Sequence, residues 1–222
     1  MTLLGIAVIG KAPRADIEDM FRASLPAGTR TVLRGCLDGL SDDEVDALRP
    51  RDGADTLYTR LRGLRDVKVS KAAVIGRAPE TLARLRADGA GALLFACTGE
   101  FPPMAGDAGV VFPSRVLAGL AAGLLPAGRL GLLVPAPEQI EKLAAKWRRP
   151  GVEVVAEALL PSADEAAAAA AGRRLAACRP DLVAMDCMSY TPAAKAAVRA
   201  ELGVPTVLAV TATARVLQEL IG

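Results

Sequence analysis

The sequence predicts an α/β protein made of two similar halves, each a parallel β-sheet with helices on both faces. Three observations support this prediction. Short apolar runs alternate with helical patterns along most of the 222 residues, which is typical of parallel sheets. A pattern of helix, strand and cysteine occurs twice. Hydrophobic residues make up 52% of the chain and aromatic residues only 3%, so we expect a large aliphatic core.

In the first half, short β-like runs indicate strands, which read as continuous apolar stretches when both faces are covered. The expected strands are residues 3–9, 31–34, 92–96 and 110–112, with a hairpin of 56–61 and 67–70. The expected helices are residues 14–24, 42–48 and 71–87. Pro13 suits the first position of the first helix. Ser41 and Glu44 have the spacing of a capping box, and Gly89 suits the end of the third helix.

The second half repeats this order without the extra segment at about residues 34–70. Its expected strands are residues 130–134, 152–156, 182–186 and 204–208. Its expected helices are residues 115–125, 137–147, 164–178, one that begins after Thr191, and 212–221. Ser162 is expected to open the helix at 164–178, and Thr191 with Pro192 the next. We place the halves at 1–113 and 114–222, with the last helix able to pack on the first half.

Composition and charge exclude several classes of function. The net charge is +2 without a basic block, and aromatic residues are few, which argues against nucleic-acid binding. The apolar start is too short to span a bilayer and lacks the features of a signal peptide, so we expect a cytoplasmic protein without a membrane contact. Four cysteines do not make a disulfide scaffold.

The chain contains no histidine. This excludes catalysis by Ser-His-Asp or Cys-His groups and removes the most common metal ligand. No glycine-rich dinucleotide motif follows a strand, so neither a cofactor nor a metal is expected. Proton transfer would have to use Cys, Asp, Glu, Lys or Tyr.

Cys97 and Cys187 follow equivalent strands of the two halves, 90 positions apart. Ligands of open α/β sheets bind at the carboxyl ends of the strands. If the halves pack face to face, the two thiols face each other across one cleft. One thiolate and one thiol on opposite sides of a carbon acid can exchange a proton without a cofactor, and the helix start after Thr191 favours a thiolate at Cys187. The alternative is that both are packing residues, as buried cysteines often are; Cys36 and Cys178 are assigned to that role.

Several polar residues near these strand ends are candidates for binding a carboxylate. Arginine pairs with carboxylates through two parallel hydrogen bonds, and backbone amides at strand ends can also hold an anion. The alternative for each is a solvated helix start or a capping turn. The candidate binding residues are Lys11, Thr98, Gly99, Ser114, Arg115, Ser189 and Tyr190. Trp147 is expected to serve packing or a subunit contact.

The two-fold design, with Ala96-Cys97-Thr98-Gly99 and Asp186-Cys187-Met188-Ser189, resembles the aspartate/glutamate racemase superfamily. That superfamily includes cofactor-independent racemases, maleate isomerase and arylmalonate decarboxylase. Over residues 1–222 the chain is identified as a member of the AroM family, whose name implies a link to aromatic amino-acid metabolism. The matching stretches are residues 39–45, 55–57, 69–70, 113–115, 134–135, 146–147 and 186–187.

The resemblance implies two flavodoxin-like halves with a site at their strand ends. The sequence departs from the superfamily pattern at both cysteines. Thr98 follows Cys97, but the usual asparagine is missing, and Met188 replaces the threonine that usually follows the second cysteine. We also expect the adjacent Asp186 to disfavour a thiolate at Cys187 by like-charge repulsion.

The leading hypothesis is a cofactor-independent racemase, isomerase or lyase that acts on a small carboxylic acid, with Cys97 and Cys187 as acid and base. Lys11, Thr98, Ser114 and Arg115 would orient the carboxylate. Two alternatives stay open: a non-catalytic protein that binds or senses a small metabolite, and an oligomer without a ligand. The sequence leaves open the substrate, a homodimeric assembly and the role of residues 34–70.

Overall fold

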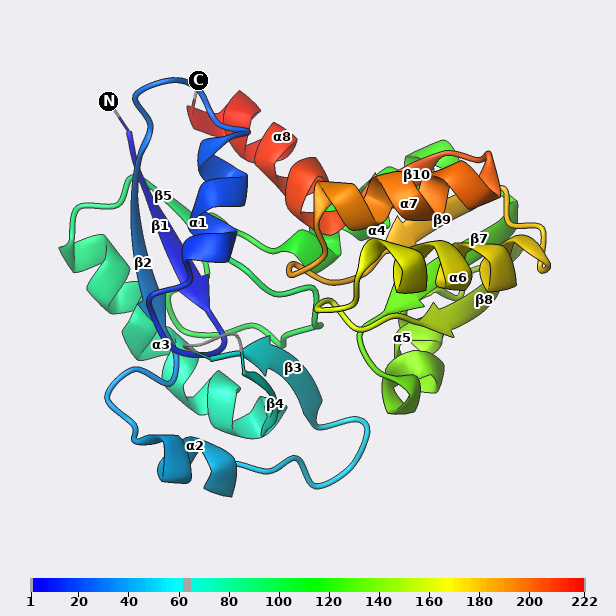
Figure 1. Ribbon diagram of the computed structural model, residues 1–222. Helices are drawn as coiled ribbons and strands as arrows, with labels where there is room; N and C mark the ends of the chain where they lie inside the picture. The colour runs from blue at the N-terminus through cyan, green and yellow to red at the C-terminus, as the bar shows by residue number, and fades with distance from the viewer. Residues whose placement is uncertain (1, 62–64, 222) are drawn as a thin grey trace. The chain divides into compact units, whose positions relative to one another are not determined.

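The computed structural model describes residues 2–61 and 65–221 and divides into two compact units (Figure 1). Unit 1 comprises Met1–Ser114 and Ala214–Gly222, and unit 2 comprises Arg115–Thr213. Helix α8 (Ala209–Ile221) therefore begins among the residues of unit 2 and ends among those of unit 1. No helix in the described part of the chain is long and apolar enough to cross a bilayer.

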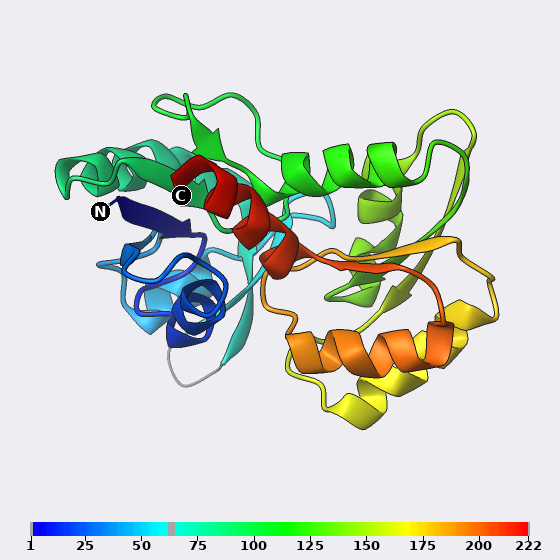
Figure 2. The ribbon, with the colours of Figure 1, turned by 90° about the horizontal axis from the view of Figure 1, so that it is seen from above.

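Unit 1 contains a four-stranded parallel sheet in the order β2-β1-β5-β6. Helices α1 and α3 lie on opposite faces of this sheet, as Figures 1 and 2 show. An antiparallel hairpin of β3 and β4 forms a separate two-stranded sheet. The bounds are β1 (Leu3–Val8), α1 (Ala15–Arg22), β2 (Arg30–Gly35), α2 (Asp42–Ala47), β3 (Thr56–Arg60), β4 (Asp66–Ser70), α3 (Lys71–Ala87), β5 (Ala92–Phe95) and β6 (Val110–Val111). Helix α4 (Pro113–Leu124) begins with Pro113 and Ser114 of this unit and continues in unit 2.

Unit 2 contains a second four-stranded parallel sheet in the order β10-β9-β7-β8. Figure 2 shows α6 and α7 side by side on one face of this sheet and α5 on the other. The bounds are β7 (Gly128–Val134), a 3₁₀ turn (Pro137–Gln139), α5 (Ile140–Trp147), β8 (Val152–Ala158), α6 (Glu165–Ala176), β9 (Leu182–Met185), α7 (Pro192–Leu202) and β10 (Thr206–Leu208).

The two sheets have the same strand order, which confirms the predicted repeat and the flavodoxin-like class. In each, the first strand lies between the second and third, and the fourth lies outside the third. The central strands even carry a glycine at the same place. A Cβ on Gly5 would lie 2.8 Å from the Cβ of Ala90, and one on Gly131 would lie 3.0 Å from Leu175 Cδ2. Both glycines therefore let neighbouring segments pack closely on the sheet.

The helix starts confirm some predictions and correct others. Ser41 forms the expected capping box, and Thr191 caps α7 with Pro192 at its start. Pro13 was expected inside α1, but the backbone does not become helical until after Arg14, which occupies the N-cap. Ser162 was expected to open α6. Asp164 does so instead, because its carboxylate accepts a hydrogen bond from the backbone N–H of Ala167 at 2.8 Å.

The hairpin of the extra segment, which the sequence predicted, lies against the carboxyl end of the unit 1 sheet. A Cβ on Gly10, just after β1, would lie 2.7 Å from Thr59 Oγ1 in β3. A Cβ on Gly99, beyond β5, would lie 3.1 Å from Leu57 Cδ2. Leu57 also belongs to the buried core of this unit. Strand β3 thus runs past the ends of β1 and β5.

Candidate functional site

Each unit places a cysteine directly beyond the third strand of its sheet. In unit 1, the backbone N–H of Gly99 points to Cys97 Sγ at 3.3 Å. In unit 2, the backbone N–H of Ser189 points to Cys187 Sγ at 3.5 Å. The two thiols are 9% and 7% exposed. Both turns therefore have the same local geometry, with an amide donor that stabilises negative charge on sulfur.

The residue before Cys187 is held by a buried polar network. The ammonium of Lys146 lies 2.8 Å from Asp186 Oδ2, and the indole N–H of Trp147 donates to the same oxygen at 2.9 Å. The side chains of Lys146 and Asp186 are 5% and 0% exposed. Both the cation and the anion are shielded from water, so the attraction between them offsets the desolvation cost of burying each charge. Helix α5 is thereby fixed to the end of β9.

The residue three positions after Cys187 is fixed in turn. Tyr190 is completely buried, and its hydroxyl donates to the carbonyl of Leu159 at 2.6 Å. Directly beyond it, Thr191 begins helix α7. The turn that carries Cys187 is therefore anchored on both sides, by Asp186 to α5 and by Tyr190 to the segment that follows β8. This anchoring restricts the position of the sulfur.

The network adds a charge that one expectation about Cys187 did not include. We expected Asp186 to disfavour a thiolate through like-charge repulsion. Lys146 supplies a positive charge within hydrogen-bonding distance of both Asp186 oxygens, at 3.1 and 2.8 Å. A cation that is distant in sequence, and that sequence analysis had left without a role, therefore balances the charge of Asp186. Trp147, expected to serve packing, is buried and also donates a hydrogen bond to this carboxylate.

The predicted binding residues fall into different surroundings. Thr98 and Gly99 share the turn of Cys97, and Ser189 and Tyr190 share the turn of Cys187. Lys11 follows β1, but its ammonium contacts the Leu40 carbonyl at 2.6 Å and Asp42 at 3.1 Å.

The remaining two predicted binding residues meet at a boundary. Ser114 is buried at the start of α4, and the adjacent Arg115 is exposed. The boundary of the two units runs between them. The carboxylate-binding roles of these residues remain predictions.

Four side chains of interest were missed by sequence analysis. Lys146 and Trp147 hold the turn of Cys187, and Tyr58 and Arg60 of β3 carry buried polar atoms that form no hydrogen bond with the described residues. The sequence offered one usable signal. A single tryptophan that packs in a core needs a partner for its indole N–H, and Asp186 is a buried acceptor. Nothing in the sequence near Tyr58 and Arg60 distinguishes a buried arginine from an exposed one.

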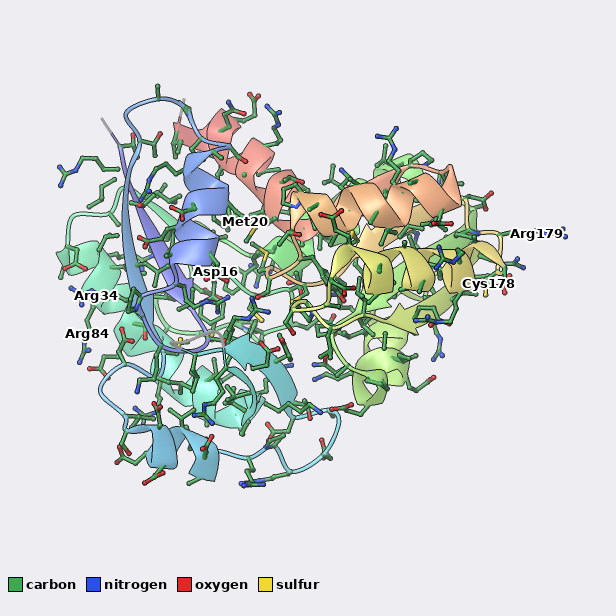
Figure 3. The ribbon with its side chains drawn as sticks, viewed as in Figure 1. Asp16, Met20, Arg34, Arg84, Cys178 and Arg179 are labelled. Atoms are coloured by element: carbon green, nitrogen blue, oxygen red, sulfur yellow. The ribbon has the colours of Figure 1, made fainter. Side chains whose placement is uncertain are left out.

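The other two cysteines have different surroundings. Cys36 follows β2 and is 3% exposed. Burial raises the pKa of its thiol to about 12, so it stays protonated at neutral pH. Cys178 is partly exposed in the turn between α6 and β9 (Figure 3), at the opposite end of β9 from Cys187. The described residues include no group of three Cys, Asp or Glu side chains suited to a metal ion.

Comparison with protein families supplies the assignment of the chain. The family model described as AroM protein matches residues 4–221. The chain belongs to the AroM family. A search of curated proteins finds no match by sequence.

Solved structures with a similar fold cover almost the whole AroM chain. An unliganded arylmalonate decarboxylase has a TM-score of 0.67 at 17% identity, over 100% of this chain and 93% of that one. A glutamate racemase from Francisella tularensis in complex with D-glutamate has a TM-score of 0.58 at 14% identity, over 99% and 81%. A mutant maleate cis-trans isomerase from Nocardia farcinica with a covalently bound succinylcysteine intermediate has a TM-score of 0.60 at 17% identity, over 99% and 92%. These similarities show that the AroM chain has the same fold as these three proteins.

Proposed function

We propose that this AroM protein is a cofactor-independent racemase, isomerase or lyase that acts on a small carboxylic acid, with Cys97 and Cys187 as its acid and base. The observation that carries the proposal is the matched geometry of the two thiols. Each follows the third strand of its sheet, and each sulfur accepts a hydrogen bond from the amide two residues later. Packing alone gives no reason for two separate turns to share this arrangement.

The chemistry needs only the two sulfurs and the substrate. A thiolate removes the proton from the carbon next to the carboxylate, and the other thiol delivers a proton to the opposite face. The protein ends with the roles of the two thiols exchanged, so no oxidant or reductant is consumed. In the decarboxylation variant, carbon dioxide leaves, the thiol protonates the resulting carbanion, and the thiolate that remains takes up a proton from water. Either reaction requires that both sulfurs, or one sulfur and a donor, reach the same carbon.

The structural neighbours support this class of reaction. The three comparison structures are a decarboxylase, a racemase with bound D-glutamate, and an isomerase with a covalently bound succinylcysteine intermediate. All three share the fold of the AroM chain. At these identities the shared fold supports the class, and the substrate has to be found by experiment.

A second candidate function is binding of a small carboxylate without turnover. Met188 favours this alternative, because it is buried directly after Cys187 and lacks the hydroxyl expected to contact a substrate carboxylate. Such a protein would retain the anion-binding groups of the strand ends and lose the proton transfer. It would bind a ligand in a saturable manner and leave the ligand unchanged.

Proton exchange distinguishes the two functions. The protein is incubated in deuterated water with amino acids, hydroxy acids and substituted malonates, and loss of the α-proton signal and release of carbon dioxide are followed by NMR. We expect exchange or decarboxylation with one class of acid, reduced at least about 100-fold in Cys97→Ser and in Cys187→Ser. Cys178→Ser is the matched control and should keep full activity. Full turnover in both site variants would contradict the proposal, and binding without turnover across the panel would favour the second function.

A further inference from the structure

Strand β3 carries polar atoms that the fold leaves unsatisfied. In the described part of the chain, Tyr58 Oη, Thr59 Oγ1 and Arg60 Nη2 are buried and have no hydrogen-bond partner. Buried polar atoms in folded proteins are almost always paired, and exceptions need an explanation such as a missing ligand. Three such atoms on consecutive residues therefore point to something that this strand binds.

Two of these three side chains share one face of the strand. Side chains alternate along a β-strand, so Tyr58 and Arg60 project to the same side, whereas Thr59 projects to the other side near Gly10. Tyr58 and Arg60 are 9% and 8% exposed. The group that could pair with both must therefore offer two acceptor atoms on this one face.

The neighbours of Arg60 occupy part of its guanidinium and leave another part open. Arg60 Nε donates to Asp66 Oδ1 at 2.9 Å, across the hairpin in register with it. The buried Arg14 donates to the backbone carbonyl of Arg60 at 3.3 Å and forms two hydrogen bonds of 2.8 Å with Asp16. The Nη2 end of Arg60 lies outside these pairs.

The charge states make both open groups donors. Burial and the interaction of its hydroxyl with the Asp66 carboxylate raise the pKa of Tyr58, so the hydroxyl stays protonated. The Tyr58 hydroxyl also lies near the guanidinium of Arg60, but neither contact has the geometry of a hydrogen bond. Burial disfavours the charge of Arg60, but its hydrogen bond to Asp66 keeps its pKa raised. Burial likewise disfavours a charged Asp16, but the hydrogen bonds from Arg14 lower the pKa of that carboxyl. The two arginines and two aspartates balance in charge, which favours a singly charged ligand over a doubly charged phosphate.

Tyr58 and Arg60 belong to β3, the strand that also contacts the turn of Cys97. Leu57 contacts the turn that contains Cys97 and Gly99, at 3.1 Å from a Cβ placed on Gly99. Tyr58 and Arg60 follow Leu57 on the same strand, and three residues of strand span about 10 Å. A carboxylate on these donors would be shielded from water, where hydrogen bonds to it are strong.

We propose that Tyr58 and Arg60 bind a carboxylate group, so that the β3–β4 hairpin forms a monoanion-binding subsite in the same unit as Cys97. The subsite takes a planar carboxylate, with Arg60 Nη2 and the Tyr58 hydroxyl each donating one hydrogen bond. One part of this inference rests on the proposed function, namely that the bound carboxylate is the one carried by the substrate. Binding itself does not depend on turnover.

The test measures binding of acetate, malonate and inorganic phosphate to the full chain by NMR titration. Tyr58→Phe removes only the hydroxyl, which forms no hydrogen bond with the described residues, so this variant should fold with unchanged or higher stability. We expect its affinity for acetate and malonate to fall about tenfold. Arg60→Lys keeps the charge and loses the planar fork, and should show a similar loss. Arg84→Lys, on the exposed pair with Glu80 (Figure 3), is the matched control and should bind normally.

The outcomes separate this inference from the proposed function. Unchanged carboxylate binding in Tyr58→Phe and Arg60→Lys would overturn the inference, even if proton exchange by the cysteines were found. Tighter binding of phosphate than of either carboxylate would also overturn it. Carboxylate binding that depends on Tyr58 and Arg60, without turnover of any acid, would support the inference and contradict the proposed function.

Discussion

Lys146 and Asp186 form a buried ion pair of 2.8 Å, and the second of these residues directly precedes Cys187. The pair joins helix α5 to the end of strand β9, forty residues further along the chain. Trp147 completes the contact through its indole N–H. The position of a candidate catalytic thiol is thus coupled to a charge pair that no local sequence pattern connects.

Breaking this pair should destabilise the protein strongly. Lys146→Met removes the cation that pairs with the buried Asp186 carboxylate and leaves the hydrogen bond from Trp147; loss of one partner of a buried ion pair typically costs about 3–5 kcal/mol in the free energy of unfolding. Urea denaturation followed through the fluorescence of the only tryptophan, Trp147, measures the loss. Arg148→Met breaks the exposed pair with Glu141 and should cost less than about 1 kcal/mol. Equal effects of both substitutions would show that Asp186 is not held as a buried charge.

The two tyrosines of the chain should respond oppositely to loss of the hydroxyl. Tyr190→Phe leaves the buried Leu159 carbonyl without its 2.6 Å donor, so we expect a loss of about 1–3 kcal/mol in the free energy of unfolding. Tyr58→Phe removes a hydroxyl that has no partner in the described chain and should cost nothing. Thermal denaturation of both variants tests this contrast, and a stable Tyr190→Phe would mean that the turn of Cys187 is anchored elsewhere.

Stability should fall at alkaline pH because of Cys36. Burial raises the pKa of its thiol from 9.0 to about 12. Between these values the unfolded chain loses the proton while the folded chain retains it, so the free energy of unfolding falls as the pH rises. One such group contributes about 1.4 kcal/mol per pH unit. Urea denaturation between pH 8 and 11 gives the free energy of unfolding at each pH. This free energy should fall less steeply with pH in Cys36→Ala than in the unaltered protein. Identical slopes would contradict this assignment.

The central glycines of the two sheets should not tolerate a side chain. A Cβ on Gly5 would lie 2.7 Å from Leu93 Cδ2 and 2.8 Å from the Cβ of Ala90, so Gly5→Ala should cost about 1–3 kcal/mol. Gly131→Ala meets atoms at 3.0 Å and should cost less. Gly76→Ala in α3 is the control: no described atom outside its own helix turn lies within 4 Å of that Cβ, and a helical alanine should stabilise by up to about 1 kcal/mol. Chemical denaturation gives the order of the three.

The repeat was predictable because its signals are local. A strand covered on both faces is apolar throughout, and the residues that start α2 and α7 lie within a few positions of the groups they cap. The equivalent places of Cys97 and Cys187 followed from the order of these elements along the chain. The helix starts at Pro13 and Ser162 were predicted wrongly: Arg14 occupies the N-cap of α1, and Asp164, two residues after Ser162, caps α6.

By itself, the sequence determined the two parallel sheets, the hairpin and the strand ends that carry the two cysteines. These features depend on periodicity and on residues close together in the chain. The tertiary structure alone decided that Lys146 compensates Asp186, that Lys11 contacts Asp42, and that Tyr58 and Arg60 are buried with open donors. Charge pairing and desolvation depend on distances between segments that are remote in sequence, and the energy of a buried charge depends on what surrounds it rather than on its neighbours along the chain.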